Sequence, residues 1–274
     1  MKNLITRSIS GLIYIAVIVV CVLAGQWSFM GLTILFCIFG LLEFNHLGLI
    51  TAKSGTRTLL TAIDLIAGTA LVTAVTLYIT TGCVITFAIY LLCLLARLTA
   101  QLYIKEEGCT SMLAHSLMGQ VYIALPLALS NIIEQYSPHL VLIMFIFIWL
   151  NDTGAYIVGS TCGKSRLFPR ISPKKSWEGF WGGAAFCLIA AIVIAYLFND
   201  TIPALRKGDI IALAEITVVF ATFGDLVESM IKRNLHVKDS GKIIPGHGGI
   251  LDRIDSLLFV ILSTLCYLIF CGQI

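Results

Sequence analysis

Long runs of apolar residues, broken by short polar segments, follow one another along the whole sequence. Most of these runs approach 20 residues, which is about the length that a helix needs to cross a hydrocarbon core of about 30 Å. We expect helices near residues 9–25, 27–44, 59–80, 83–104, 112–132, 139–159, 178–198, 209–231 and 253–271. The pattern therefore predicts an all-α, polytopic integral membrane protein with about nine transmembrane helices.

The composition agrees with this interpretation. Of the 274 residues, 58% are hydrophobic and 12% are charged, and the mean hydropathy is +0.96. Soluble domains carry about 25% charged residues, so this chain has too few charges to cover a surface that faces water. The net charge of +3 is small and no long basic run occurs, which argues against nucleic acid as a partner.

The basic residues predict how the helices are oriented, because cytoplasmic loops of membrane proteins are enriched in lysine and arginine. With the N-terminus in the cytoplasm, fifteen of the 18 basic residues fall in cytoplasmic segments, and only Arg206 and Lys207 fall outside. Ten of the fifteen lie in the segments 164–175 and 232–253, which then share the cytoplasmic face. If the first two apolar runs formed one re-entrant hairpin, the N-terminus would move but these two segments would not.

A polar face marks the end of the eighth apolar run, where Asp225, Glu228, Ser229, Lys232 and Arg233 fall at helical spacings of three and four. A charged residue at the centre of a membrane helix costs about 2.5–3.5 kcal/mol on insertion scales. Such residues therefore face a bundle interior or a polar cavity. We assign Asp225 to a functional site, whereas the two basic residues also fit a membrane edge.

A glycine-rich segment, Pro-Gly-His-Gly-Gly at 245–249, follows this face and precedes the last apolar run. Glycines let backbone amides approach a phosphate closely, and a helix that starts nearby is a favourable anion site. An ordinary Pro-Gly turn is the alternative. We assign phosphate or substrate contacts to Lys238, Asp239, His247, Gly248 and Gly249, with His247 orienting a phosphate by hydrogen bonding.

Two aspartates, Asp252 and Asp255, lie three residues apart in the first turns of the last helix, with Arg253 between them. Together with Asp225 on the preceding helix they offer carboxylate oxygens to a hard cation. Magnesium takes one or two carboxylates and completes its coordination with water and phosphate oxygens. We therefore expect a magnesium site that receives a metal–triphosphate substrate, and not a histidine-based zinc site.

A second polar group begins inside the sixth apolar run, at Asn151 and Asp152. Unpaired polar groups are costly there, so these side chains either pair with another helix or line a polar cavity. The basic segment that follows offers lysines and hydroxyls to phosphate from the cytoplasmic side. In and beside it, we assign substrate contacts to Ser172, Lys174, Lys175, Ser176 and Glu178.

These motifs together resemble a known family. The run S-x-x-K-R-x-x-x-x-K-D…P-G-H-G-G-x-x-D-R-x-D at 229–255 is similar to the signature of phosphatidate cytidylyltransferases, as are N-D-T-G-A-Y at 151–156 and S-P-K-K-S-W-E-G at 172–179. The resemblance covers residues 149–256, whereas residues 1–140 match only as apolar helices. We therefore assign 1–140 to packing, lipid access and dimerisation, and 141–274 to catalysis.

The resemblance implies the transfer of a cytidylyl group from CTP to phosphatidic acid, with release of pyrophosphate, in a bacterial cytoplasmic (inner) membrane. It also implies Mg²⁺, a second, monovalent cation such as K⁺, and a homodimer. Electrostatic stabilisation should dominate this chemistry, because the attacking phosphate oxygen is already ionised. Within that scheme we assign Asp225, Asp252 and Asp255 to the metal, Lys232, Arg233, Lys238 and Arg253 to phosphates, and Ser229 to the substrate.

Two other functions compete with this one. A CTP-dependent lipid kinase of the dolichol-kinase type has a similar nucleotide region and would release CDP instead of pyrophosphate. A transporter would use Asp64, Asp152 and Asp225 as an ion path, but the concentration of glycine, lysine and paired aspartates in the cytoplasmic segments argues against it. The D-G…A-R…G…D…D pattern of CDP-alcohol phosphotransferases is absent from the sequence.

Overall fold

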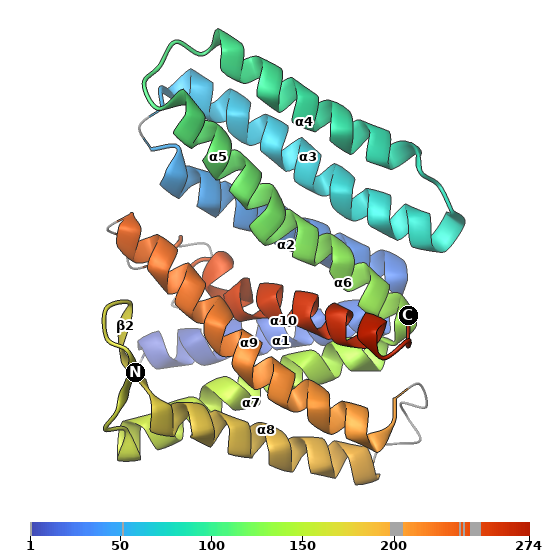
Figure 1. Cartoon of the computed structure of the whole chain (residues 1–274), viewed down its shortest axis with the longest axis vertical. Coiled ribbons are helices and arrows are strands. Elements are labelled where there is room, and N and C mark those ends of the chain that lie inside the picture. Colours follow the sequence, from blue (N-terminus) through green and yellow to red (C-terminus); the bar gives the residue numbers. More distant parts are fainter. Residues whose placement is uncertain (1, 51, 198–204, 236, 238, 242–247) are drawn as a thin grey trace. The chain divides into compact units, whose positions relative to one another are not determined.

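A computed structural model describes residues 2–50, 52–197, 205–235, 237, 239–241 and 248–274 (Figure 1). Nearly all of the described chain is helical, apart from one short antiparallel hairpin. Each apolar run corresponds to a helix or to one continuous helical segment. The prediction of an all-α polytopic protein is confirmed.

In chain order the elements are α1 (Lys2–Leu23), α2 (Gln26–Gly48), α3 (Ser54–Thr81), α4 (Ile85–Tyr103), α5 (Cys109–Gly119), the π-helix η1 (Gln120–Ala124), α6 (Leu125–Tyr136), α7 (Pro138–Cys162), β1 (Arg166–Phe168), β2 (Ser172–Ser176), α8 (Trp177–Leu197), α9 (Lys207–Asn234) and α10 (Leu251–Phe270). In the described residues, eight helical segments are long and apolar enough to cross a membrane, with Cys109–Tyr136 counted as one. The apolar part of α1, Ile9–Leu23, is shorter.

The chain divides into two compact units. The first unit consists of residues 1–135 and 239–254, and the second of residues 136–238 and 255–274. The described residues at the two ends of the signature segment, 239–241 and 248–254, therefore belong to the same unit as the N-terminal helices. This division by packing is separate from the functional division at residue 140, which stays a prediction.

In the first unit, a buried ion pair joins α3 to α4. Arg97 and Asp64 are 1% and 2% exposed, and the Arg97 Nε lies 3.5 Å from the Asp64 Oδ1. The Ser116 hydroxyl donates to Asp64 and accepts a 2.8 Å hydrogen bond from Arg97, while the Asn45 amide donates to Asp64 at 2.9 Å. These contacts offset the cost of placing two charges within membrane helices.

In the second unit, glycines allow α7 and α8 to approach each other backbone to backbone. A Cβ atom on Gly154 would lie 2.9 Å from the carbonyl oxygen of Gly182 and 3.1 Å from the Cα of Gly183. Small residues of this kind permit close helix packing in membranes. Figure 1 shows α7, α8 and α9 beside one another, with the β1–β2 hairpin at one end. The packing brings the polar end of α7 close to the basic segment before α8.

The β1–β2 hairpin pairs Arg166 with Ser176 and Phe168 with Ser172, and no pattern in the sequence predicted these strands. Its junction with α8 is fixed by two side chains. The Ser176 Oγ accepts a hydrogen bond of 3.1 Å from the backbone N–H of Gly179, as a helix-capping residue does. The Glu178 carboxylate accepts hydrogen bonds of 3.1 Å from the backbone N–H groups of Lys164 and Ser165, so it holds the chain just before β1.

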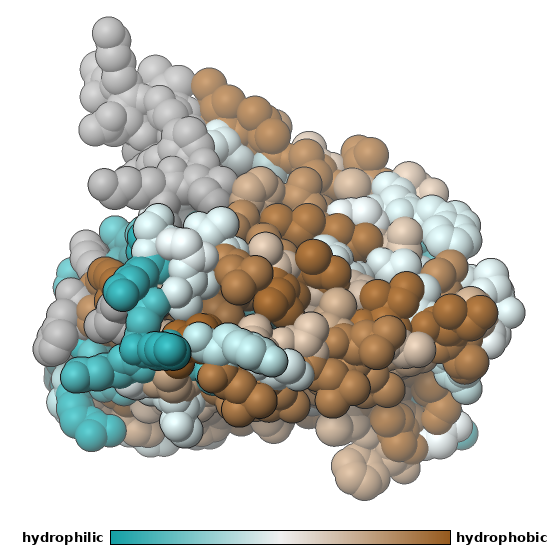
Figure 2. Space-filling view, turned by 90° about the horizontal axis from the view of Figure 1, so that it is seen from above, coloured by the Kyte–Doolittle hydropathy of each residue, from teal (hydrophilic) through white to brown (hydrophobic). Residues whose placement is uncertain are grey.

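Large apolar side chains lie on the surface of the transmembrane helices. On α4 they include Leu92 and Leu102, which are 63% and 82% exposed. Figure 2 shows that hydrophobic residues cover most of one face, while hydrophilic residues gather at one end. Such a surface suits a bilayer, where the surrounding solvent is itself apolar.

Candidate active site

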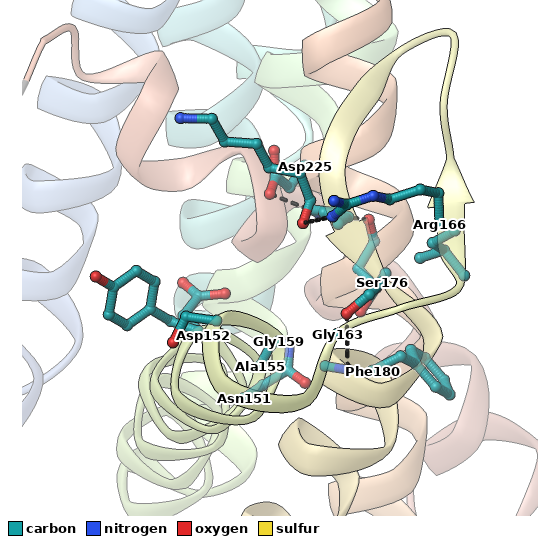
Figure 3. Close-up of a pocket in the computed structure, with 16 residues that line it drawn as sticks. Asn151, Asp152, Ala155, Gly159, Gly163, Arg166, Ser176, Phe180 and Asp225 are labelled. Atoms are coloured by element: carbon teal, nitrogen blue, oxygen red, sulfur yellow. Dashed lines mark hydrogen bonds and ion pairs between the residues drawn. The ribbon is translucent and has the colours of Figure 1, made fainter.

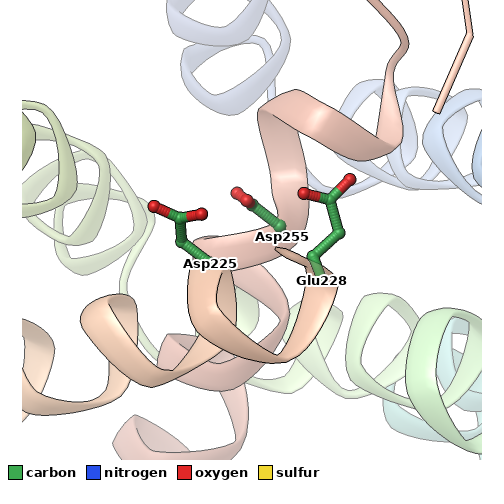
Figure 4. Close-up of side chains that lie close together, drawn as sticks. All are labelled: Asp225, Glu228 and Asp255. Carbon is green, nitrogen blue, oxygen red and sulfur yellow. The ribbon is translucent and has the colours of Figure 1, made fainter. Parts of the chain in front are cut away.

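Three acidic side chains of the second unit converge, Asp225 and Glu228 from α9 and Asp255 from α10 (Figure 4). One carboxylate oxygen of each lies within 4.8 Å of the others, and Glu228 and Asp255 are 1% and 9% exposed. We call these residues the acid cluster. Three carboxylates so close together repel one another, so a bound cation would lower their electrostatic energy.

A glycine on α9 allows the acid cluster to form. A Cβ atom on Gly224 would lie 2.7 Å from the backbone oxygen of Asp255 and 2.9 Å from the Cα of Ser256. The Ser256 hydroxyl donates to the backbone oxygen of Ala221 at 3.1 Å, which ties the two helices together at this level. The spacing of three between Asp225 and Glu228 then places both acids on the side of α9 that faces Asp255.

Two lysines partly neutralise the acid cluster. The Lys175 Nζ lies 2.6 Å from the Asp225 Oδ2, and the Lys232 Nζ lies 2.5 Å from the Glu228 Oε2 one helical turn away. The Ser229 hydroxyl donates to the Asp225 Oδ1 at 3.2 Å. Both lysines were assigned to phosphates from the sequence, and each lies beside an acid of the cluster.

A cavity of about 600 Å³ lies next to the acid cluster in the second unit (Figure 3). Ligand-binding pockets commonly measure about 300–1,000 Å³. Asp225 belongs both to the cavity wall and to the acid cluster, so the cavity reaches the cluster at this residue. The cavity wall also includes Asn151 and Asp152 from α7, Arg166, Lys174, Lys175 and Ser176 from the hairpin, and Thr222 from α9.

Asn151 and Asp152 are placed differently within this wall. Asn151 is 3% exposed, and its Oδ1 has no hydrogen-bond partner among the described residues. That oxygen packs against Gly183 of α8. Asp152 is exposed, and its carboxylate points into the cavity in Figure 3. Both side chains therefore line a cavity, whereas their assignment to a substrate stays a prediction.

The remaining residues assigned from the sequence are distributed between the two units. In the second unit, Arg233 is exposed and donates to the backbone oxygen of Val237 at 3.4 Å, and Ser172 lies in β2 outside the cavity wall. In the first unit, Asp239 and Arg253 are exposed, and Gly248 has a positive φ of 86°. Lys238 and His247 lie outside the described residues.

Asp252 lies in the first unit and accepts backbone hydrogen bonds. Its carboxylate receives the N–H of Gly249 at 2.9 Å and the N–H of Ser240 at 3.1 Å. An acid at the first turn of a helix is favourable because free N–H groups and the helix dipole attract negative charge. Its assignment to the metal stays a prediction, as does the identity of that metal.

Two buried acids that contact the candidate site or the signature segment, Glu228 and Glu43, were not assigned from the sequence. Glu228 lies three residues after Asp225 on the same polar face of α9. That spacing was the signal that Glu228 belongs to the same candidate metal site. Glu43 is the only acidic residue of α2 and is 5% exposed. An acid in an apolar run is a signal of function, but the sequence does not show which distant segment it meets.

These features define a class of protein: a polytopic helical membrane protein whose acid cluster could hold a cation and whose cavity offers Arg166, Lys174 and Lys175 to anionic groups. Comparison of the whole chain narrows this class. The model of the cytidylyltransferase family matches residues 5–271, and the chain belongs to that family.

Individual relatives match the chain over shorter stretches. A phosphatidate cytidylyltransferase of Staphylococcus haemolyticus is 43% identical over 148 residues, which cover 54% of this chain and 56% of the relative. One of Haemophilus influenzae is 48% identical over 119 residues, covering 43% and 41%. One of Staphylococcus saprophyticus is 51% identical over 123 residues, covering 45% and 46%. The chain thus spans about half the length of the curated relatives it matches.

Proposed function

We propose that this protein is a phosphatidate cytidylyltransferase, which converts CTP and phosphatidic acid into CDP-diacylglycerol and pyrophosphate. The observation that carries the proposal is the acid cluster at the wall of a cavity that also contains Lys174, Lys175 and Arg166. Acids that can bind a cation and bases that can bind phosphates are both needed for a triphosphate substrate. Membership of the family and the names of the matched relatives agree with this function.

The reaction is a displacement at the α-phosphorus of CTP. An ionised phosphate oxygen of phosphatidic acid forms the new P–O bond, the bond to the bridging oxygen of the β-phosphate breaks, and pyrophosphate leaves with the electron pair. No side chain has to remove a proton from the nucleophile. The protein contributes by aligning two anionic substrates and by stabilising the negative charge that develops between them.

Asp225, Glu228 and Asp255 are the described residues that would hold a divalent cation. Their carboxylate oxygens suit Mg²⁺, which prefers oxygen ligands. When bound, Mg²⁺ would neutralise the triphosphate and help to orient it. The proposal also includes Asp252 as a ligand and a second, monovalent cation (K⁺), both implied by the resemblance.

The lysines next to the acids are the proposed phosphate ligands of the chain itself. Lys175 contacts Asp225 and also lines the cavity, and Lys174 lies beside it on the cavity wall. A phosphate that enters the cavity therefore meets two ammonium groups. Lys232 and Arg233 add two more positive charges, in the last turn of α9. Such charges also screen the repulsion between the two anionic substrates.

The proposal places the reaction at the cytoplasmic side of a bacterial inner membrane, in a homodimer. The distribution of basic residues supports this orientation, because fifteen of the 18 fall on the side of the two basic segments.

An assay with two labels tests the reaction. Purified protein in mixed micelles is given phosphatidic acid, Mg²⁺ and CTP labelled at either the α- or the γ-phosphate. The proposal predicts that the α-label enters the lipid and that the γ-label appears in pyrophosphate. Transfer of the γ-label to the lipid, with release of CDP, would establish the lipid kinase instead.

A further inference from the structure

Glu43 of α2 holds the segment that leads into α10. Its Oε1 accepts the backbone N–H of Ile250 at 3.0 Å, and its Oε2 accepts the backbone N–H of Leu251 at 2.9 Å. The Ser240 hydroxyl donates to the same Oε2 at 2.9 Å. All of these residues belong to the first unit. A side chain of the second helix thus receives three hydrogen bonds from residues about 200 positions later.

The backbone approaches this carboxylate so closely at two glycines that a side chain at either position would displace it. A Cβ atom on Gly241 would lie 2.7 Å from the Glu43 Cδ, and one on Gly249 would lie 2.6 Å from the same carbon. Both glycines lie in the segment that the sequence assigns to substrate binding. Because these glycines lack a side chain, the backbone can approach the Glu43 carboxylate closely. This holds whether or not the glycines also contact a phosphate.

Asp252 also forms hydrogen bonds with this segment, at Ser240 and Gly249. It accepts the backbone N–H groups of Ser240 and Gly249, whereas Glu43 takes the Ser240 hydroxyl and the N–H groups that follow Gly249. Ser240 and Gly249 flank the middle of the signature segment. Two carboxylates therefore fix the positions at which this segment begins and ends.

A carboxylate at position 43 suits the surrounding hydrogen-bond donors better than a neutral side chain would. A carboxylate buried in an apolar helix is costly unless hydrogen bonds compensate it. All the donors that surround Glu43 in the described chain are neutral, and two are free N–H groups at the start of α10, where negative charge is favoured. A glutamine would turn one of the two acceptors into a donor that faces other donors.

We propose that Glu43 is a positioning residue for the reaction. It acts through Gly249, Ile250 and Leu251, and so fixes the substrate-binding segment and the first turn of α10 relative to α2. This inference rests on the proposed function for its catalytic consequence. It gives the N-terminal helices a part in positioning the signature segment, beyond packing and lipid access.

The test compares Glu43→Gln with Glu134→Gln, a matched control that alters another buried acid of the first unit, 2% exposed in α6. Hydrogen exchange is measured on peptides that cover residues 239–251, together with kcat and KM for CTP. Losing charge-assisted hydrogen bonds should raise exchange in that segment about 10-fold or more and lower kcat/KM for CTP by at least as much. Glu134→Gln should change neither quantity.

The outcomes separate the inference from the proposed function. Unchanged exchange in 239–251 overturns the inference, as does exchange that rises throughout the first unit. Faster local exchange with wild-type kinetics overturns the catalytic part. If the wild type makes no CDP-diacylglycerol, the proposed function fails, while the exchange data still decide whether Glu43 holds the segment. Should Glu43→Gln not insert, Ser240→Ala removes one of the three donors and is expected to act in the same direction.

Discussion

At the scale of single residues, the acids of the membrane helices have two kinds of environment. In the first unit, Asp64 is enclosed by Arg97, Ser116 and Asn45, which leaves its carboxylate fully engaged. In the second unit, Asp225 pairs with Lys175 but also faces a cavity. An enclosed acid stabilises packing, whereas an acid on a cavity can meet a ligand. Asp64 therefore does not behave as one step of an ion path.

Lys175→Gln tests the residue that joins the cavity to the acid cluster. Lys164→Gln is the matched control, because Lys164 comes from the same basic segment, is exposed, and lies outside the cavity wall. We expect Lys175→Gln to lower kcat/KM for CTP or phosphatidic acid by about 10-fold or more, as the loss of a charged hydrogen bond to a phosphate would. Kinetics with each substrate varied separately measure this effect. Equal activities for the two variants would remove Lys175 from the site.

At the scale of elements, the positions of the helices in the sequence were predictable, but the contacts between helices were not. Apolar length sufficed to predict the helices, because the bilayer demands it. The β1–β2 hairpin has no alternating apolar pattern, so nothing in residues 166–176 indicated strands. Asp225 and Asp255 were assigned to one site from their types and motif. Glu43 was not assigned, because its partners are distant in sequence and only the folded chain brings them together.

Gly224→Ala tests the approach of α9 to α10 that forms the acid cluster. The added methyl group would meet the backbone of Asp255 and Ser256, which cannot move without shifting α10. We expect the free energy of unfolding to fall by about 1–3 kcal/mol, and activity to fall because Asp255 moves away from Asp225. Gly208→Ala in the same helix is the control, since a Cβ atom there has no neighbour within 4 Å.

Thermal unfolding in detergent and CDP-diacylglycerol formation measure the two effects of Gly224→Ala. Wild-type behaviour in both would show that α10 does not need this close contact. A loss in Gly208→Ala of the same size would show that alanine disturbs α9 by another route.

At the scale of the whole molecule, the membrane orientation decides whether the site can receive CTP. The two basic segments and the acid cluster must lie on the cytoplasmic side for this function. The two ends of α9 can test this orientation, because Gly208 lies near the first residue of the helix and Asn234 is its last. If α9 spans the bilayer, these positions lie on opposite sides.

Single cysteines at positions 170, 208 and 234 report this orientation, in a background that lacks the nine native cysteines. All three positions are exposed. An impermeant thiol reagent should reach positions 170 and 234 only from the cytoplasmic side and position 208 only from outside. Labelling of 170 and 234 from opposite sides would contradict a shared site for the hairpin and the end of α9.

The central claim is that the acid cluster holds the cation used in cytidylyl transfer. The most direct measurement is CDP-diacylglycerol formation against Mg²⁺ concentration for the wild type, Glu228→Gln and Glu215→Gln. Glu215 is a matched control, since it lies in α9 but outside the acid cluster. Loss of a ligand or of its support weakens metal binding by about 10- to 100-fold. We predict that Glu228→Gln needs at least 10-fold more Mg²⁺ for half-maximal activity and that Glu215→Gln does not. The same Mg²⁺ requirement in all three proteins would contradict the account.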